Sequence, residues 1–202
     1  MNIPFWVAGG RTVDLLDLQP EDIAAVPLGD ALAKLNRFSG RSPEPWSVAA
    51  HSVLVEQLCP PGLGPWALLH DAHEAILGDM TTPAVEFIAH AGRIPHLAEA
   101  IATVKGRIDR VIGAAWGVPV RSVSREIRRA DRIALQAEAI LFLHAKPVLF
   151  DPQDDEDIDR ALGLLRGMQA ASEWRSARAL WLSRVEHHTQ TGGMSPPKAS
   201  KP

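Results

Sequence analysis

The strongest constraint on the fold is the way in which proline and glycine divide the chain into segments of helical length. Neither residue is favourable inside a helix, so clusters such as 39–46 (SGRSPEPW) and 60–65 (PPGLGP) mark connections between elements. Between these clusters, apolar residues recur about once per helical turn, which is typical of helices with one buried face. The sequence therefore predicts a mostly α-helical fold.

The predicted helices begin and end at residues that are common at helix termini. Ser47 suits the N-cap of one helix, Ser122 or Ser124 suits the N-cap of another, and Gly78 suits the C-terminal end of a third. The helices are predicted, in chain order, over about 21–35, 47–58, 66–77, 84–91, 96–115, 122–145, 155–168 and 173–186.

We interpret the chain as one all-α domain over 1–188, followed by a tail. Within 1–20, two apolar stretches flank Gly9-Gly10, which predicts a short N-terminal β-hairpin. The last residues, 189–202, are rich in proline, glycine and serine and contain few apolar side chains, so we expect a disordered tail.

Length and composition exclude several classes of protein. The 202 residues suit one domain, and a single cysteine, Cys59, excludes a disulfide framework or a cysteine-built zinc site. No apolar run is long enough to span a membrane, and the N-terminus lacks signal-peptide features, so we expect a cytoplasmic protein without a membrane partner. The net charge of −3 argues against binding to polymeric nucleic acid, but it leaves a nucleotide-sized substrate open.

Four residues on three predicted helices have the chemistry of a metal site: His51, His70, Asp71 and Asp131. Imidazole nitrogens and carboxylate oxygens are the usual ligands of a catalytic divalent transition metal. The helices that carry His51 and His70 are joined by a short connection, so they can pack as antiparallel neighbours, while Asp131 would come from a distant helix. Four such ligands leave coordination positions open for water and a phosphate oxygen.

Glu74 follows Asp71 by three residues, which places both on one face of the predicted helix. Glu74 is therefore the candidate general acid or base. Most of the other histidines are expected to be ordinary core or surface residues, and His73 is either one of these or a group that supports the site or faces the substrate.

The string HDAHEAILGDMTTP (70–83) resembles the HD-domain metal-dependent phosphohydrolases, and most of all their 5′-deoxynucleotidase branch. NRFSGR and WSVAAHS before it, and RRADRIALQAE after it, extend the resemblance over roughly 10–145. The resemblance implies an all-α HD-domain bundle, often a homodimer or higher homo-oligomer. It also implies a divalent metal cofactor, cobalt or manganese in the first place, with zinc, magnesium or iron as alternatives.

The resemblance also implies a role for each matching residue. The metal ligands would be His51, His70, Asp71 and Asp131. Glu74 would activate or position the attacking water, and Asp79 would contact the sugar 3′-hydroxyl.

Further substrate contacts are expected on the segment before the first histidine. By the same resemblance, Arg37 would lie near the substrate phosphate, and Phe38 would crowd the 2′ position and so select deoxyribose. Trp46, alone among the six tryptophans, is a candidate for contact with the substrate, because it lies in the loop that leads to His51.

Each of these residues also has a plainer interpretation. The four ligands could form a buried polar cluster without a metal, although unpaired buried carboxylates are costly. Glu74 could be a salt-bridge partner of an arginine, and Asp79 a turn residue after Gly78. Arg37 could be a surface charge, and Phe38 part of the core.

The sequence departs from the family pattern in two places. The family string usually continues from its final TP into a lysine, but Ala84-Val85-Glu86 stands here instead, so Lys105 and Arg107 are the candidates to replace that cation. Phe38 stands where the 5′-deoxynucleotidases commonly have a tryptophan.

The function that the resemblance implies is metal-dependent hydrolysis of 2′-deoxynucleoside 5′-monophosphates to deoxynucleoside and phosphate. One alternative is a deoxynucleoside triphosphate triphosphohydrolase, which the missing lysine favours slightly. Another is a non-catalytic nucleotide sensor, which Glu74 and Asp79 argue against, since a structural metal needs no adjacent base. Hydrolysis of cyclic or signalling dinucleotides is disfavoured by the short chain and by the lack of a second-metal histidine set.

Overall fold

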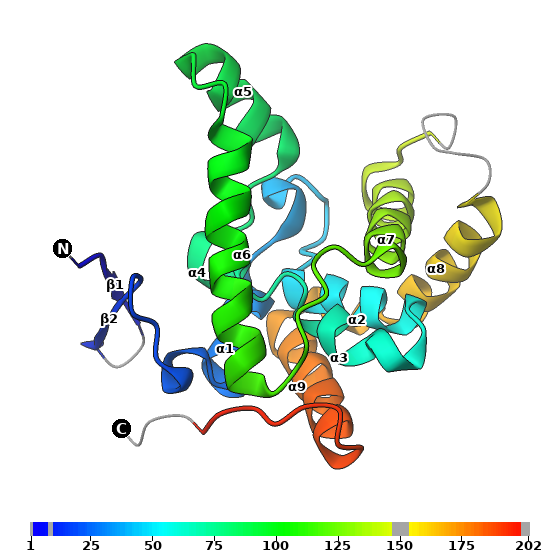
Figure 1. Cartoon of the computed structure of the whole chain (residues 1–202). Helices are drawn as coiled ribbons and strands as arrows, with labels where there is room; N and C mark the ends of the chain where they lie inside the picture. The colour runs from blue at the N-terminus through cyan, green and yellow to red at the C-terminus, as the bar shows by residue number, and fades with distance from the viewer. Residues whose placement is uncertain (1, 8–9, 147–153, 199–202) are drawn as a thin grey trace.

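A small antiparallel sheet at the N-terminus precedes a bundle of helices in the computed structural model, which describes residues 2–7, 10–146 and 154–198 (Figure 1). In the sheet, β1 (Pro4–Trp6) pairs with β2 (Thr12–Asp14). The prediction of an all-α fold with a short N-terminal hairpin is confirmed. Gly9 of the predicted turn lies outside the described residues.

The helical elements follow the Pro/Gly breaks closely. In chain order they are η2 (Pro20–Ile23), α1 (Ala25–Lys34), η3 (Arg37–Gly40), α2 (Val48–Leu58), η4 (Pro61–Leu63), α3 (Gly64–Leu69), α4 (Glu74–Leu77), α5 (Thr82–Gly92), α6 (Leu97–Trp116), α7 (Arg125–Leu143), α8 (Asp155–Gly167), η7 (Gln169–Ser172) and α9 (Trp174–Gln190).

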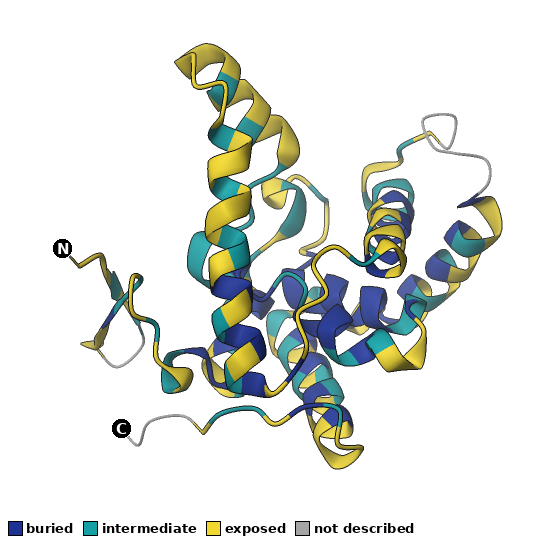
Figure 2. Ribbon diagram, in the orientation of Figure 1, coloured by how far each residue is buried: buried dark blue, intermediate teal, exposed yellow. Residues whose placement is uncertain are grey.

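Helix α2 lies at the centre of the bundle and contacts α1, α3, α7, α8 and α9 (Figure 1). Every residue from Val48 to Glu56 is buried, so the ribbon of α2 is dark almost throughout (Figure 2). A helix that is surrounded by others must be apolar on all sides, and the polar residues that it does carry need partners within the protein. As predicted, Ser47 caps the helix by accepting a hydrogen bond from the Ala50 amide.

The predicted continuous helix over 66–77 is wrong. The chain forms α3, then a turn over 70–73, and then α4. In this turn the Ala72 amide donates to the Leu69 carbonyl and the Glu74 amide donates to the Asp71 carbonyl, both at 2.9 Å. These are i to i+3 bonds, which give about three residues per turn and bring the side chains of residues three apart directly over one another. Asp71 and Glu74 are therefore closer than an α-helix would place them.

The expected disordered tail from Thr189 is also wrong for the part that the structure describes. Helix α9 continues to Gln190, the side chain of Met194 is buried, and the Ser195 amide donates to the Trp116 carbonyl at 2.8 Å. A buried apolar side chain and several backbone hydrogen bonds, including those from Gly193 and Met194 to the His188 carbonyl, hold this segment against the bundle. Composition alone does not reveal these contacts. Residues 199–202 lie outside the described residues.

Helix α5 and the first half of α6 form an arm that projects from the bundle and is largely exposed (Figure 2). The side chain of Phe87 on this arm is 71% exposed, and that of Ile88 is 49% exposed. Over the described part of the chain, no helix combines the length and the apolar character that crossing a membrane requires.

Candidate metal centre

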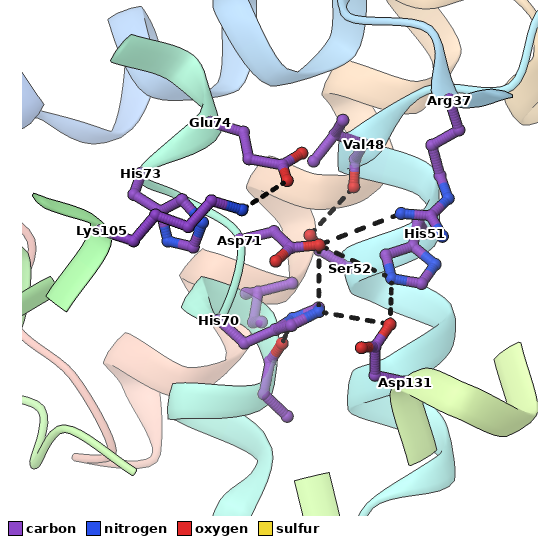
Figure 3. Close-up of polar contacts among 12 residues, drawn as sticks. Arg37, Val48, His51, Ser52, His70, Asp71, His73, Glu74, Lys105 and Asp131 are labelled. Carbon is purple, nitrogen blue, oxygen red and sulfur yellow. Dashed lines mark hydrogen bonds and ion pairs between the residues drawn. The ribbon is translucent and has the colours of Figure 1, made fainter. Parts of the chain in front are cut away.

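Three of the four predicted ligands converge from helices that are far apart in the sequence. His51 comes from α2, His70 follows the last residue of α3, and Asp131 comes from α7 (Figure 3). The His51 Nε2 atom lies 3.0 Å from Asp131 Oδ1, and the His70 Nε2 atom lies 3.9 Å from the same oxygen. One nitrogen or oxygen atom from each of the three residues lies within 4.8 Å of the others, so the group could hold a metal ion.

Asp71, the fourth predicted ligand, faces the same point from the turn after α3 (Figure 3). Its Oδ2 atom lies 3.2 Å from His70 Nε2 and 3.7 Å from His51 Nε2. Burial raises the pKa of Asp71, but the neighbouring charges of His70 and His51 lower it more, so the pKa stays well below its ordinary value. The structure thus brings all four residues together with the carboxylates ionised.

A hydrogen bond at the Nδ1 atom orients the ring of each histidine. His51 Nδ1 lies 2.8 Å from Glu138 Oε1, and His70 Nδ1 lies 2.7 Å from the Ala67 carbonyl oxygen. A carboxylate or a carbonyl can only accept, so each Nδ1 donates and each Nε2 is turned toward the centre. This is the usual arrangement of a metal-binding histidine.

The environment of the two Nε2 atoms fits a cation. His70 Nε2 is buried and has no hydrogen-bond partner in the described part of the chain, although Asp71 lies close by. At His51, burial and Arg37 lower the pKa, whereas Glu138 and Asp131 raise it more, to about 9. A positive charge between His51 and Asp131 is therefore favoured, whether a proton or a metal ion supplies it.

Glu138 is a functional residue that the sequence analysis missed. It has no exposed side-chain surface, and it accepts hydrogen bonds from His51 Nδ1, from Trp46 Nε1 at 2.8 Å and from Arg37 Nε at 3.0 Å. Burial raises the pKa of Glu138, but Arg37 and His51 lower it below its ordinary value. The available signal was its position seven residues after Asp131, which places both carboxylates on one face of α7 two turns apart.

Trp46 does not have the predicted contact with a substrate. Its side chain is fully buried, with the ring centroid 4.9 Å from that of Phe142 and the indole nitrogen bonded to Glu138. A residue without accessible surface cannot touch a ligand. Trp46 instead helps to hold the Glu138 carboxylate in place behind His51.

Glu74 lies beside the cluster and is 5% exposed. Its Oε1 atom lies 3.6 Å from Lys105 Nζ, and its Oε2 atom has no hydrogen-bond partner among the described residues. Burial and the charges of Asp71 and Asp79 raise the pKa of Glu74 to about 8, although Lys105 lowers it. A carboxyl group with a pKa near neutrality can both accept and donate a proton, as a general acid or base must.

A cavity of about 550 Å³ opens onto the cluster. Its wall includes Arg37, Phe38 and Asp79, which are residues predicted to contact the substrate. Arg37 is held by Glu138, its Nη1 atom lies 3.9 Å from Asp71 Oδ2, and its side chain is 11% exposed. Burial raises the pKa of Asp79. The cavity is large enough for a nucleotide-sized ligand.

Of the two candidates for the missing cation, only Lys105 lies at the cavity. Lys105 comes from α6 and lines the wall beside Glu74. The Arg107 guanidinium instead donates to the Leu16 carbonyl at 2.7 Å, at the N-terminal segment. Of these two residues, Lys105 is therefore the one whose charge lies at the cavity.

A larger cavity, of about 800 Å³, lies at the C-terminal end of α2, and none of the sequence-predicted site residues lines it. Its buried charge is already neutralised, because Glu56 accepts from Arg184 at 2.7 Å and contacts His188 Nε2 at 3.0 Å. The smaller cavity is therefore the candidate functional site, because its wall carries titratable groups with shifted pKa values.

The fold and the site together define an all-α protein with clustered histidine, aspartate and glutamate side chains that could hold a metal ion. No family model matches the sequence. The chain is 34% identical over 142 residues to an uncharacterized protein of Rhodobacter capsulatus, across 64% of this chain and 68% of that protein. It therefore belongs to the same family as the Rhodobacter protein.

A second relative is the uncharacterized protein YfdR of Escherichia coli. The two sequences are 31% identical over 121 residues, which cover 60% of this chain and 62% of YfdR. Neither relative carries a named activity, so the function of this chain must be argued from its own residues.

Proposed function

We propose that the protein is a metal-dependent phosphohydrolase of the HD-domain type that converts 2′-deoxynucleoside 5′-monophosphates to deoxynucleoside and phosphate. The observation that carries the proposal is that His51, His70, Asp71 and Asp131 meet at the wall of a nucleotide-sized cavity, with Glu74 beside them. The family resemblance of residues 70–83 supports the same function.

The donor set fits a divalent transition metal such as cobalt or manganese. Two imidazole nitrogens with fixed rings and two carboxylates surround one point, and His70 Nε2 needs a partner there. An ion held at that point would supply Lewis acidity toward a phosphoryl oxygen and lower the pKa of water.

The remaining residues of the cavity have roles that follow from their chemistry. Glu74 would accept a proton from the attacking water, because its raised pKa suits proton transfer near neutral pH. Arg37 lies beside Asp71 and Lys105 lies beside Glu74, and both cations would offset charge that develops on the phosphate. Asp79 would accept a hydrogen bond from the sugar, and Phe38 would limit space at its 2′ position.

The decisive experiment measures phosphate release from dAMP in the presence of cobalt. The wild-type protein should release phosphate, and Glu74→Gln should lose at least about a hundredfold in kcat, the usual contribution of general acid–base catalysis, while it keeps the ion held by His51, His70, Asp71 and Asp131. The matched control is Glu86→Gln on the exposed arm, which should behave as wild type. Full activity in Glu74→Gln would refute the proposed role of this residue.

A deoxynucleoside triphosphate is the second candidate substrate. It is favoured by a third cation, Arg41, which lines the cavity together with Arg37 and Lys105. Release of intact triphosphate from dATP, with no phosphate from dAMP, would identify this alternative. If neither nucleotide is hydrolysed but both bind with equal affinity to wild type and Glu74→Gln, the protein is a nucleotide sensor.

We also propose that the protein acts as a homodimer or a higher homo-oligomer, as the family resemblance implies. The exposed apolar side chains of Phe87 and Ile88 on the α5–α6 arm support this, because solvent-exposed apolar groups of this size often mark contact surfaces.

A further inference from the structure

His73 is a buried histidine whose ring is held in the same way as those of His51 and His70. Its Nδ1 atom lies 2.9 Å from Asp109 Oδ1, and the other oxygen of Asp109 accepts a hydrogen bond from Ser122 Oγ at 2.9 Å. Since a carboxylate can only accept, Nδ1 donates and Nε2 presents its lone pair elsewhere. His73 is 5% exposed, and its Nε2 atom has no hydrogen-bond partner in the described part of the chain.

Two carboxylates face this histidine. One ring nitrogen of His73 and one oxygen each from Asp71 and Glu74 lie within 4.8 Å of one another. The tight turn over 70–73 produces this proximity, because it brings Asp71 and Glu74 directly over one another. Glu74 Oε2 also lacks a hydrogen-bond partner within the described residues, so two buried polar atoms in this group are unpaired.

The two unpaired atoms of this group, His73 Nε2 and Glu74 Oε2, are buried polar atoms, and such atoms need a partner. Lys105 Nζ lies 3.6 Å from the other oxygen of Glu74, Oε1 (Figure 3). Asp71, His73 and Glu74 therefore offer one nitrogen and two oxygen atoms within reach of a single ion, which is a donor set suited to a divalent cation.

We propose that Asp71, His73 and Glu74 form a second divalent-cation site beside the first, with Asp71 shared by both. The sequence analysis found no second set of histidines, and the structure provides a mixed set of one imidazole and two carboxylates instead. Such a donor set suits manganese or magnesium more than a thiol-seeking metal. Two ions that share a carboxylate would lie about 3.5–4 Å apart, as in enzymes that bind both the attacking and the leaving oxygen of a phosphate.

The proposal goes beyond the proposed function and can be tested without a substrate. The full-length protein is treated with a chelator, dialysed against Mn²⁺ alone, and analysed for bound manganese per chain. Wild type should saturate at two ions per chain, and His73→Ala should saturate at one. The matched control is His90→Ala on the exposed face of α5, which should still bind two ions.

Lys105 provides a test in the opposite direction. Its ammonium group and the second ion compete for Glu74, so Lys105→Met should tighten binding of the second ion while the first is unchanged. Electron paramagnetic resonance of the loaded protein should show spin coupling between two Mn²⁺ ions in wild type and an isolated Mn²⁺ signal in His73→Ala. An isolated signal in wild type contradicts a shared carboxylate.

If His73→Ala does not fold, Asp109→Asn serves in its place, because it leaves the imidazole present but weakens its support. Loss of such a supporting group typically costs about 10–100-fold in metal affinity, and only the second ion should be affected. One ion per chain in wild type, two ions in His73→Ala, or an unchanged second affinity in Asp109→Asn overturns the proposal. No bound manganese in wild type would overturn both metal sites, whereas a single bound ion would overturn only the second site.

Discussion

At the scale of single residues, the candidate metal centre depends on side chains that support the predicted ligands. Glu138 accepts from His51, Trp46 and Arg37 at once, although no part of it is exposed. A buried carboxylate is costly unless it is fully paired, and two of the three partners here, His51 and Arg37, belong to the site or to the cavity wall. The orientation of His51 is therefore linked to the position of Arg37 through a single side chain.

Glu138→Gln is expected to lower both metal affinity and stability. The amide cannot balance the charges of Arg37 and His51, and the loss of such support should weaken Mn²⁺ binding by about 10–100-fold. Leaving buried charges unpaired should also destabilise the fold by about 3–5 kcal/mol. Calorimetric titration with Mn²⁺ and urea unfolding measure the two effects.

The control for this variant is Glu126→Gln, on the exposed first turn of the same helix. Its stability should change by about 0.5 kcal/mol at most, with metal affinity unchanged. Equal effects of the two variants would show that Glu138 has no special role.

His51 gives the chelator-treated protein a defined dependence on pH. Burial lowers its pKa, but Glu138 and Asp131 raise it from 6.5 to about 9. The folded state therefore binds this proton more tightly than the unfolded state, so the stabilisation is complete below pH 6.5 and is lost as the pH rises through about 9.

Thermal unfolding of the chelator-treated protein should consequently show a falling midpoint across this interval. Saturating Mn²⁺ should flatten the curve, because the ion replaces the proton between His51 and Asp131. A midpoint that rises from pH 7 to pH 9 without metal would contradict the assigned proton.

At the scale of elements, the decisive feature is the interruption between α3 and α4. The turn over 70–73 brings Asp71 over Glu74, and Gly78 then ends α4 with a φ of +78°. This conformation is accessible to glycine at little cost and is strained for a residue with a Cβ atom. The chain can thus change direction directly after α4 and place Asp79 at the same cavity.

Gly78→Ala is expected to destabilise the protein by about 1 kcal/mol, which corresponds to roughly 2–4 °C in the unfolding midpoint of a chain of this size. The space around Gly78 is open, so the cost arises from the backbone and not from a clash. Gly62→Ala, in equally open space and without a positive φ, is the matched control and should leave the midpoint nearly unchanged. Differential scanning calorimetry distinguishes the two, and equal midpoints would refute the strain argument.

At the scale of the whole molecule, the buried helix α2 packs against the other helices that position the site, while the α5–α6 arm is largely exposed to solvent (Figure 2). Ligands from α2, from the end of α3 and from α7 meet only because α2 packs against both of the others. On the arm, Phe87 is 71% exposed and Ile88 is 49% exposed.

If the arm forms the contact of a homodimer, Phe87→Asp should convert the protein to a monomer, because it places a charge in an apolar interface. Light scattering measures the mass, and the unfolding midpoint of the monomer reports whether its fold is intact. The control is Val123→Asp. Val123 is 78% exposed and lies outside the arm, so this variant should leave the dimer intact. A wild-type monomer would contradict the proposed oligomer.

The helical class, most element boundaries and the residues that meet at the centre could be predicted from the sequence. These features depend on local rules: apolar period, N-caps such as Ser47 and Ser124, and chain reversals at glycine. Tertiary packing, in contrast, sets which carboxylates support the histidines, how tightly the chain turns after His70, and where Trp46 points. These features depend on contacts between residues far apart in the chain, such as His51 and Glu138 with a separation of 87 residues, and no local pattern encodes such a pairing.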